Sequence, residues 1–273
     1  MSYYSYTKAE KIIGCEKINK KTTGDFYIVM GFQRSGTSLL SKIVSSCEVN
    51  FGKSNELKKA EITNPDGFYE HRKINELSWE YLDQSNYNST KISNFDLHPK
   101  NKSSRIKRLF TVKNMHEVLF NLSKKSKKIG LKLFPLFYYL WKDYLPGHKI
   151  IAIYRNPYSS AHSYLNVFWP SKLSFEHALN LWIQAQKDLL YHITQKESLL
   201  ISYEDLLDEH KQDNIIEKII SFIGEGDKNK IKSIVNKKLN RNTEKANEIQ
   251  KKYPKKTEVD EVFRKLEEVK FKA

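Results

Sequence analysis

Short apolar runs alternate with longer segments of helical periodicity along most of the chain. Runs rich in β-branched and aromatic residues occupy residues 26–30, 128–134 and 148–154, and a fourth begins at 198. Such runs are typical of parallel strands buried on both faces. Apolar residues spaced three and four positions apart predict helices in the intervening segments, at residues 37–47, 68–82, 105–123, 136–145 and 174–195.

The residues between these segments support the same division into strands and helices. Asn156 and Pro157 fit the cap and first position of a helix over 156–169, and the fourth strand runs into a short helix ending near 207. Residues 84–102 are rich in Ser, Asn and Lys and carry little periodicity, whereas the tail from 214 onward is helical and rich in lysine. The longest apolar run is far shorter than a membrane span.

Alternating strands and helices predict an α/β fold, a three-layer sandwich with a central parallel sheet of the P-loop nucleotide-binding kind. We expect a lead-in at 1–25, one domain at 26–240 with a Ser/Asn/Lys-rich excursion near 84–128, and a helical tail at 241–273. Ligands of such sheets bind at the carboxyl ends of the strands. The residues that follow Met30, Phe134 and Tyr154 are therefore candidates for a site.

The segment "GFQRSGTS" after the first strand resembles a triphosphate-binding loop without its lysine. Gly31, Gly36 and Ser38 have the expected spacing, but Thr37 occupies the lysine position. Backbone N–H groups and a helix N-terminus still suit an anion, and Arg34 adds charge from within the loop. The loop therefore suits a shorter group than a triphosphate, such as a 5′-phosphate with one more group attached.

A second candidate anion site follows the third strand. Arg155 ends that strand, and Ser163 lies eight residues later on the next helix. Two interpretations are open from these residues alone: an arginine and a hydroxyl that bind an anion, or an arginine that pairs with an acid and a serine at a packing contact.

Together the two segments resemble the sulfotransferases that use 3′-phosphoadenosine 5′-phosphosulfate (PAPS). Arg34, Ser35, Gly36, Thr37 and Ser38 match the 5′-phosphosulfate loop of that family. The 3′-phosphate motif of the family matches at "RNP" from Arg155 and at Ser163, and "NPDGFYE" from 64 and "ISYEDLL" from 201 are similar to segments of bacterial members. The resemblance covers about 26–207.

The resemblance implies transfer of a sulfuryl group from PAPS to a hydroxyl or amine, with adenosine 3′,5′-bisphosphate (PAP) as product and no metal. Arg34 is expected at the bridging oxygen and leaving phosphate, with Lys132 as a second contact. Thr37, Ser38 and the backbone of Ser35 and Gly36 are expected to hold the 5′-phosphate. The acceptor is left open among glycans, lipids and small molecules.

The resemblance leaves the catalytic base open, because the histidine that many cytosolic members carry in this segment is missing after Lys132. Members with a glutamate base carry it after the first helix, where Glu56, Glu61 and Glu70 fall. Glu70 lies in the recognisable "GFYEHR", and Glu56 matches the offset of protein-tyrosine sulfotransferases. Both stay candidates, and the aromatic residue that stacks on adenine is not identified.

The net charge of +15 has two interpretations. An anionic partner would explain it, but only seven of the 47 basic residues are arginine, the side chain suited to bidentate phosphate binding. We favour a general over-use of lysine over a nucleic-acid partner, and single arginines are then more informative than the total charge. The basic stretch 100–128 either faces an acidic acceptor or is an ordinary solvated face.

The remaining expectations concern location and competing functions. The two cysteines, Cys15 and Cys47, form no disulfide or metal pattern, and the N-terminus lacks the apolar core of a signal peptide, so we expect a cytoplasmic protein. The alternatives are a nucleotide kinase with a degenerate phosphate loop and a basic nucleic-acid-binding module. The sequence does not determine the oligomeric state.

Overall fold

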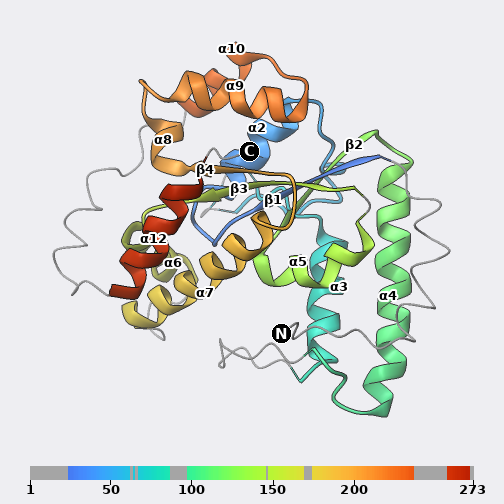
Figure 1. Ribbon diagram of the computed structural model, residues 1–273. Coiled ribbons are helices and arrows are strands. Elements are labelled where there is room, and N and C mark those ends of the chain that lie inside the picture. Colours follow the sequence, from blue (N-terminus) through green and yellow to red (C-terminus); the bar gives the residue numbers. More distant parts are fainter. Residues whose placement is uncertain are drawn as a thin grey trace.

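The computed structural model describes residues 24–61, 64, 67–86, 97–145, 147–168, 174–236 and 257–270. Its centre is a parallel sheet of four strands in the order β2–β1–β3–β4 (Figure 1). The strands are β1 (Asp25–Met30), β2 (Lys128–Leu133), β3 (Lys149–Tyr154) and β4 (Ser198–Ser202), each within two residues of its predicted bounds. Because β2 and β3 pair with opposite sides of β1, the winding direction reverses at β1. The carboxyl end of β1 is therefore the switch point at which such sheets bind ligands.

Helices cover both faces of the sheet, which confirms the three-layer prediction (Figure 1). In β1, Phe26, Ile28 and Met30 belong to one apolar core, whereas Tyr27 and Val29 belong to the other. The smaller core is closed by helices α2 (Thr37–Ser46), α8 (Tyr203–Leu207), α9 (Gln212–Ile223) and α10 (Lys228–Asn236). The larger core is closed by α3 (Arg72–Asp83), α4 (Lys102–Ser123), α5 (Pro135–Trp141), α6 (Pro157–Phe168), α7 (Phe175–Ile193) and α12 (Thr257–Val269).

The predicted helix starts differ from the structure at one informative place. Apolar spacing from 68 predicted a helix that in fact begins at Arg72. Gly67 and Tyr69 both have positive φ, at 84° and 57°, and His71 forms an antiparallel bridge with Leu57, so the chain turns before α3 starts. The prediction at 156 is confirmed, since Asn156 Oδ1 accepts hydrogen bonds from the backbone N–H groups of residues 158 and 159, both at 3.1 Å.

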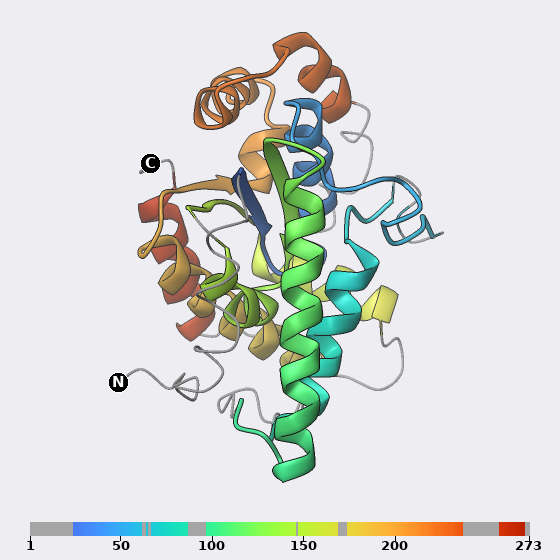
Figure 2. The same ribbon diagram turned by 90° about the vertical axis from the view of Figure 1, so that its right-hand side faces the viewer.

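Helix α4 is the long basic helix that the sequence predicted, and it begins three residues earlier than expected. The Asn101 side chain caps it by accepting from Ser104 N at 2.8 Å. It lies alongside α3 as a long outer helix (Figure 2). One of its arginines has a structural role, because Arg108 is buried, donates to Ser85 Oγ and lies over the Tyr81 ring. Residues 87–96 of the polar excursion lie outside the described part.

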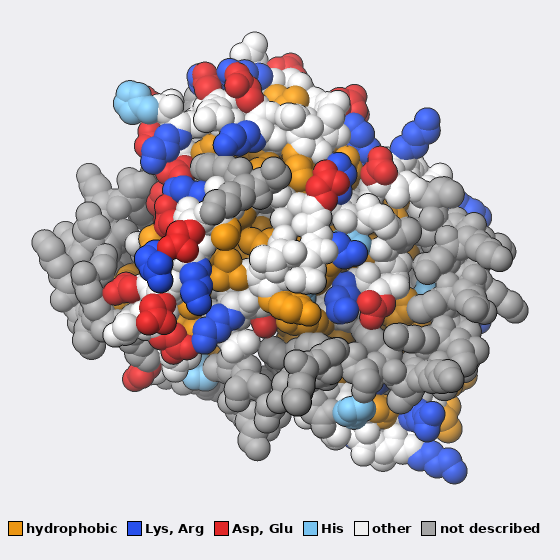
Figure 3. Space-filling view, viewed as in Figure 1, with side chains coloured by type: hydrophobic (Ala, Val, Ile, Leu, Met, Phe, Trp, Pro, Cys, Tyr) orange, Lys and Arg blue, Asp and Glu red, His pale blue; other side chains and the backbone are white. Residues whose placement is uncertain are grey.

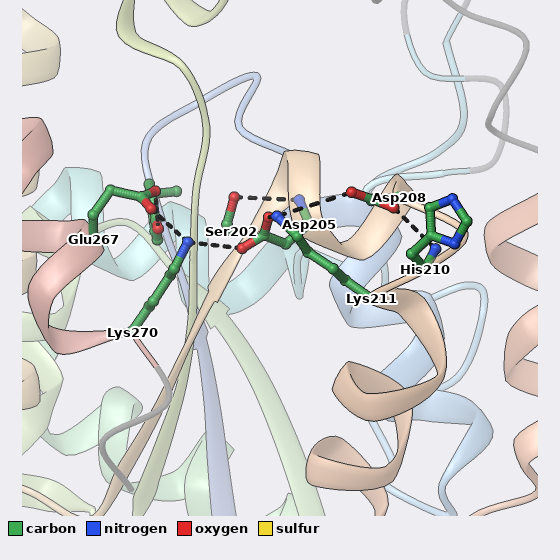
Figure 4. Close-up of polar contacts among 8 residues, drawn as sticks. Ser202, Asp205, Asp208, His210, Lys211, Glu267 and Lys270 are labelled. Atoms are coloured by element: carbon green, nitrogen blue, oxygen red, sulfur yellow. Dashed lines mark hydrogen bonds and ion pairs between the residues drawn. The ribbon is translucent and has the colours of Figure 1, made fainter.

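The C-terminal helix α12 returns to the main body of the molecule. Val259, Val262 and Leu266 are buried in the larger core, where α12 packs against α7, and the Phe263 ring meets the Tyr154 ring of β3 edge to face. A polar network joins the end of α12 to α8: Lys270 donates to Asp205 Oδ2 at 2.8 Å, and Lys211 donates to Asp205 Oδ1 at 2.7 Å (Figure 4). Burial alone would raise the pKa of Asp205, but the two lysines outweigh it and lower that pKa.

The cysteines and the apolar helices bear on two further expectations from the sequence. Cys47 is buried as a free thiol, while Cys15 lies outside the described part. Within that part, no helix is long and apolar enough to span a membrane. On the face seen in Figure 3, Lys and Arg side chains are interspersed with Asp and Glu side chains.

Candidate active site

The loop between β1 and α2 is shaped by two glycines. A Cβ at Gly31 would lie 2.4 Å from the Ile153 carbonyl oxygen, so the loop can leave β1 against β3 only with glycine there. Gly36 caps α2 with φ of 96°, and a Cβ there would lie 2.3 Å from the Tyr203 ring. Among the described residues no side chain caps α2, and its first turn contains no acidic residue. The first N–H groups of a helix have no partner within it, so this end presents donors and positive potential.

The two predicted anion motifs meet at this loop. Arg34 Nε donates to Ser163 Oγ at 3.2 Å, and Arg155 Nη1 donates to the Arg34 carbonyl oxygen at 3.2 Å. Arg34 has a positive φ of 67°, a backbone conformation that is uncommon for residues other than glycine. Two segments more than 120 residues apart in the chain thus form one cationic site at the carboxyl ends of β1 and β3.

Both arginines are partly buried within this site. Burial lowers the pKa of Arg34, and the nearby positive charge of Arg155 lowers it further. The Arg155 guanidinium lies 4.8 Å from the centre of the Tyr203 ring. Its Nε is buried and has no hydrogen-bond partner among the described residues. A buried cationic N–H without a partner is costly, and an anionic ligand would satisfy it.

The hydroxyl groups of the loop have different surroundings. The Ser35 side chain is fully buried and shares a hydrogen bond of 3.3 Å with Ser160 Oγ, so it fastens the loop to α6. Thr37 is buried at the start of α2. Ser38 Oγ accepts from Lys132 Nζ at 3.0 Å and from Asn64 Nδ2 at 2.9 Å. Ser38 therefore links the loop to β2 and to the segment before α3.

Lys132 and Glu70 form a buried ion pair beside the loop. Lys132 Nζ lies 3.1 Å from Glu70 Oε1 and donates to the Phe68 carbonyl oxygen at 2.8 Å. The other carboxylate oxygen of Glu70 accepts from Asn75 Nδ2 at 3.0 Å. The side chains of Lys132 and Glu70 are only 6% and 10% exposed. Burial lowers the pKa of Lys132, and the Glu70 carboxylate opposes that shift.

Glu56 lies in a separate cluster. Its carboxylate binds Lys125 Nζ at 2.6 Å and the backbone N–H of Lys53 at 2.8 Å, and the side chain is 27% exposed. The hydrogen bond from Lys125 lowers the pKa of Glu56. Among the described residues the predicted site thus assembles around Arg34, Arg155 and Lys132, with Glu70 in contact and Glu56 apart from it.

Four further side chains that the sequence analysis did not assign also contact residues of the site. Asn64 and Asn75 contact Ser38 and Glu70, while Ser160 contacts Ser35. Glu204 accepts from the backbone N–H after Arg155 at 3.0 Å, and burial raises its pKa. Asn64 and Glu204 lie in the quoted segments "NPDGFYE" and "ISYEDLL", so a signal existed for their location. Nothing local to the sequence indicated their partners.

A parallel sheet with a glycine-bounded loop and a helix N-terminus at its switch point defines a P-loop-like α/β fold. The chain belongs to the sulfotransferase family: the family model of the sulfotransferase domain matches residues 25–272. Family membership supports sulfuryl transfer as the general activity. No curated protein sequence is significantly similar to the chain.

The solved structures that align with the chain are distant from it in sequence. The sulfotransferase domain from the curacin biosynthetic pathway has 16% identity and a TM-score of 0.47, covering 90% of this chain and 98% of that one. Retinol dehydratase in a complex with retinol and PAP has 15% identity and a TM-score of 0.46, covering 92% and 83%. A sulfotransferase from Alicyclobacillus acidocaldarius has 15% identity and a TM-score of 0.39, covering 82% and 98%.

Proposed function

We propose that this protein is a PAPS-dependent sulfotransferase that transfers the sulfuryl group to a hydroxyl or amine of its acceptor. The observation that carries the proposal is the junction of Arg34, Ser163 and Arg155, with two contacts of 3.2 Å. It supports one ligand with an anionic group at each end, as PAPS has and ATP does not. Family membership supports the same donor.

The residues on the donor side fit such a ligand. The uncapped end of α2, with Thr37 and Ser38 in its first turn, would hold the 5′-phosphate. Arg155 and Ser163 would hold the 3′-phosphate, and the unpartnered Nε of Arg155 is a donor suited to it. Thr37 in place of a lysine fits a donor without a γ-phosphate.

Three side chains suit the transfer step. Arg34 and Lys132 would stabilise the negative charge that develops on the leaving phosphate, because Arg34 belongs to the loop before α2 and Lys132 contacts Ser38 in the first turn of α2. Glu70 is the base that we propose, since its carboxylate touches Lys132 and Lys132 touches Ser38. The carboxylate would accept the proton of the acceptor hydroxyl. Glu56 binds Lys125 instead, which supports a structural role.

Location and the absence of a metal stay expectations. Cys47 is a free buried thiol, which is compatible with the reducing cytoplasm that the sequence suggested. Among the residues described, no three His, Cys, Asp or Glu side chains are grouped as metal ligands. We propose that backbone N–H, hydroxyl and guanidinium groups hold the donor.

Calorimetric titration tests the donor assignment directly. We expect PAP to bind in the presence of EDTA, and ATP with Mg²⁺ to bind at least tenfold more weakly. Arg34→Ala and Lys132→Met should abolish sulfuryl transfer from ³⁵S-labelled PAPS in a screen of hydroxylated acceptors. Preference for ATP with Mg²⁺ would support the kinase alternative, and salt-sensitive binding of duplex DNA without PAP binding would support the nucleic-acid alternative.

A further inference from the structure

The Ser38 hydroxyl accepts two hydrogen bonds from groups that can only donate. Lys132 Nζ lies 3.0 Å from Ser38 Oγ, and Asn64 Nδ2 lies 2.9 Å from it. An ammonium group and an amide nitrogen are donors only, whereas a hydroxyl oxygen has two acceptor lone pairs and carries one hydrogen. Both lone pairs of Ser38 Oγ are therefore occupied, and its own hydrogen is left to be donated to another group.

The Gly67 carbonyl group fixes the orientation of the Asn64 amide. Asn64 Nδ2 also donates to the Gly67 carbonyl oxygen, at 2.5 Å. A carbonyl oxygen only accepts, so an amide rotated by 180° would place two acceptor oxygens against each other. Asn64 is buried, and its backbone is bonded to that of Glu61 in both directions, at 2.8 and 3.3 Å. The amide therefore presents a hydrogen, and not an oxygen, to Ser38.

The hydrogens of the Lys132 ammonium group are committed as well. An ammonium group has three N–H donors. Besides Ser38 Oγ, Lys132 Nζ contacts the Phe68 carbonyl oxygen at 2.8 Å and Glu70 Oε1 at 3.1 Å. Each of its three hydrogens thus has an acceptor in this arrangement. The influence of Lys132 on a group bound at the loop therefore passes through Ser38.

The remaining hydrogen of Ser38 lies at the open end of α2. Ser38 is the second residue of that helix and is half-buried, and the N-terminus beside it has no side-chain cap among the described residues. Within the same part of the chain, Ser38 Oγ has no hydrogen-bond partners other than Lys132 and Asn64. An anionic oxygen at this helix end would receive the hydroxyl hydrogen together with the backbone N–H groups.

We propose that Asn64 is a positioning residue, which donates to Ser38 Oγ and thereby turns the Ser38 hydroxyl hydrogen toward the 5′-phosphate of the sulfuryl donor. The inference rests on the proposed function and adds to it a residue that acts through another side chain. Hydrogen bonds in a chain polarise one another, so a hydroxyl that accepts from the Lys132 cation is also a stronger donor. Asn64 fills the other lone pair and leaves the hydroxyl a single role, that of donor to the phosphate.

Calorimetry with PAP and with adenosine 3′-monophosphate (3′-AMP), which has no 5′-phosphate, tests the inference. Ser38→Ala removes the hydroxyl and should raise the Kd for PAP about tenfold. Asn64→Leu has a similar volume but cannot donate, and it should raise that Kd about fivefold. Neither variant should change the Kd for 3′-AMP more than about twofold. The double variant should bind PAP at most about twofold more weakly than Ser38→Ala alone, because Asn64 acts through Ser38.

The control and the outcomes separate this inference from the proposed function. Asn101→Leu removes an amide that accepts from Ser104 N at the start of α4, and the Kd for PAP should stay unchanged. Losses that multiply in the double variant, equal losses for PAP and 3′-AMP in Asn64→Leu, or an unchanged Kd for PAP in that variant would each overturn the inference while the donor assignment stands. If the wild-type protein does not bind PAP, the proposed function itself is wrong and the inference falls with it.

Discussion

Arg155 offers the sharpest test of how the donor is recognised. Its guanidinium donates to the Arg34 carbonyl oxygen at 3.2 Å, lies over the Tyr203 ring and keeps a buried Nε without a hydrogen-bond partner among the described residues. Arg155→Ala removes this donor and the positive charge together. The backbone of "RNP" should persist, because Asn156 still caps α6 and its N–H still binds Glu204.

The expected loss can be estimated from these contacts. A hydrogen bond to a charged group contributes roughly 1.5–3 kcal/mol, and Arg155 can present at least one such bond through Nε. A second guanidinium nitrogen can add another such bond, and the sum is reduced because the side chain is partly exposed. We therefore expect Arg155→Ala to weaken the free energy of PAP binding by about 3 kcal/mol. This corresponds to a Kd for PAP raised about 100-fold. Arg155→Lys keeps the charge but loses the planar fork, so an increase of about tenfold is expected.

Calorimetry with PAP and with ADP provides the assay. ADP has the 5′-phosphates but no 3′-phosphate, so its affinity should change less than about threefold in Arg155→Ala. The control is Arg264→Ala, which removes an exposed arginine of α12 that is paired with Glu268 at 2.6 Å. Equal losses for PAP and ADP would mean that Arg155 supports the fold of the loop. An unchanged Kd for PAP would refute the assignment altogether.

Three other predictions concern the base, the pH dependence of stability and the C-terminal network. Glu70→Gln should lower kcat at least about 100-fold with PAP affinity retained, and Glu56→Gln should leave kcat nearly unchanged; the opposite result would make Glu56 the base. Burial lowers the pKa of His116 from 6.5 to about 4, so the unfolded state takes up its proton first as the pH falls. In urea unfolding, the free energy of unfolding of the wild-type protein should therefore fall by about 2 kcal/mol more than that of His116→Phe between pH 8 and pH 5. The difference should level off below pH 4. Parallel pH profiles of the two proteins would exclude His116 as the cause. Asp205→Asn should lower the free energy of unfolding by about 2 kcal/mol, because Lys270 and Lys211 lose their shared carboxylate. As a control, Asp213→Asn removes an exposed carboxylate and should have no measurable effect. Equal stability of the two Asn variants would contradict a role for the network.

Local sequence was sufficient to predict the strands, most of the helices and the two candidate anion motifs. The strands follow from apolar runs and the helices from spacing and caps, because these signals depend on neighbours within one or two turns. The two anion motifs were visible for the same reason, since each is a strand end followed by a helix start. Their meeting at Arg34 and Arg155 was an inference from the parallel sheet, and the structure joins them.

Contacts between distant segments were decided only by the tertiary structure. Glu70 and Glu56 both lie between the first helix and α3, and nothing in their local sequence distinguishes the one beside Lys132 from the one beside Lys125. The helix predicted from 68 failed at its start because residues with positive φ turn the chain there, and that turn carries Glu70 inward. Periodicity records which side of an element faces the core, whereas the choice of partner depends on how the elements pack. The sequence by itself therefore determined the elements and the two candidate anion motifs, and the fold decided which glutamate lies beside Lys132, because that choice depends on packing between distant segments.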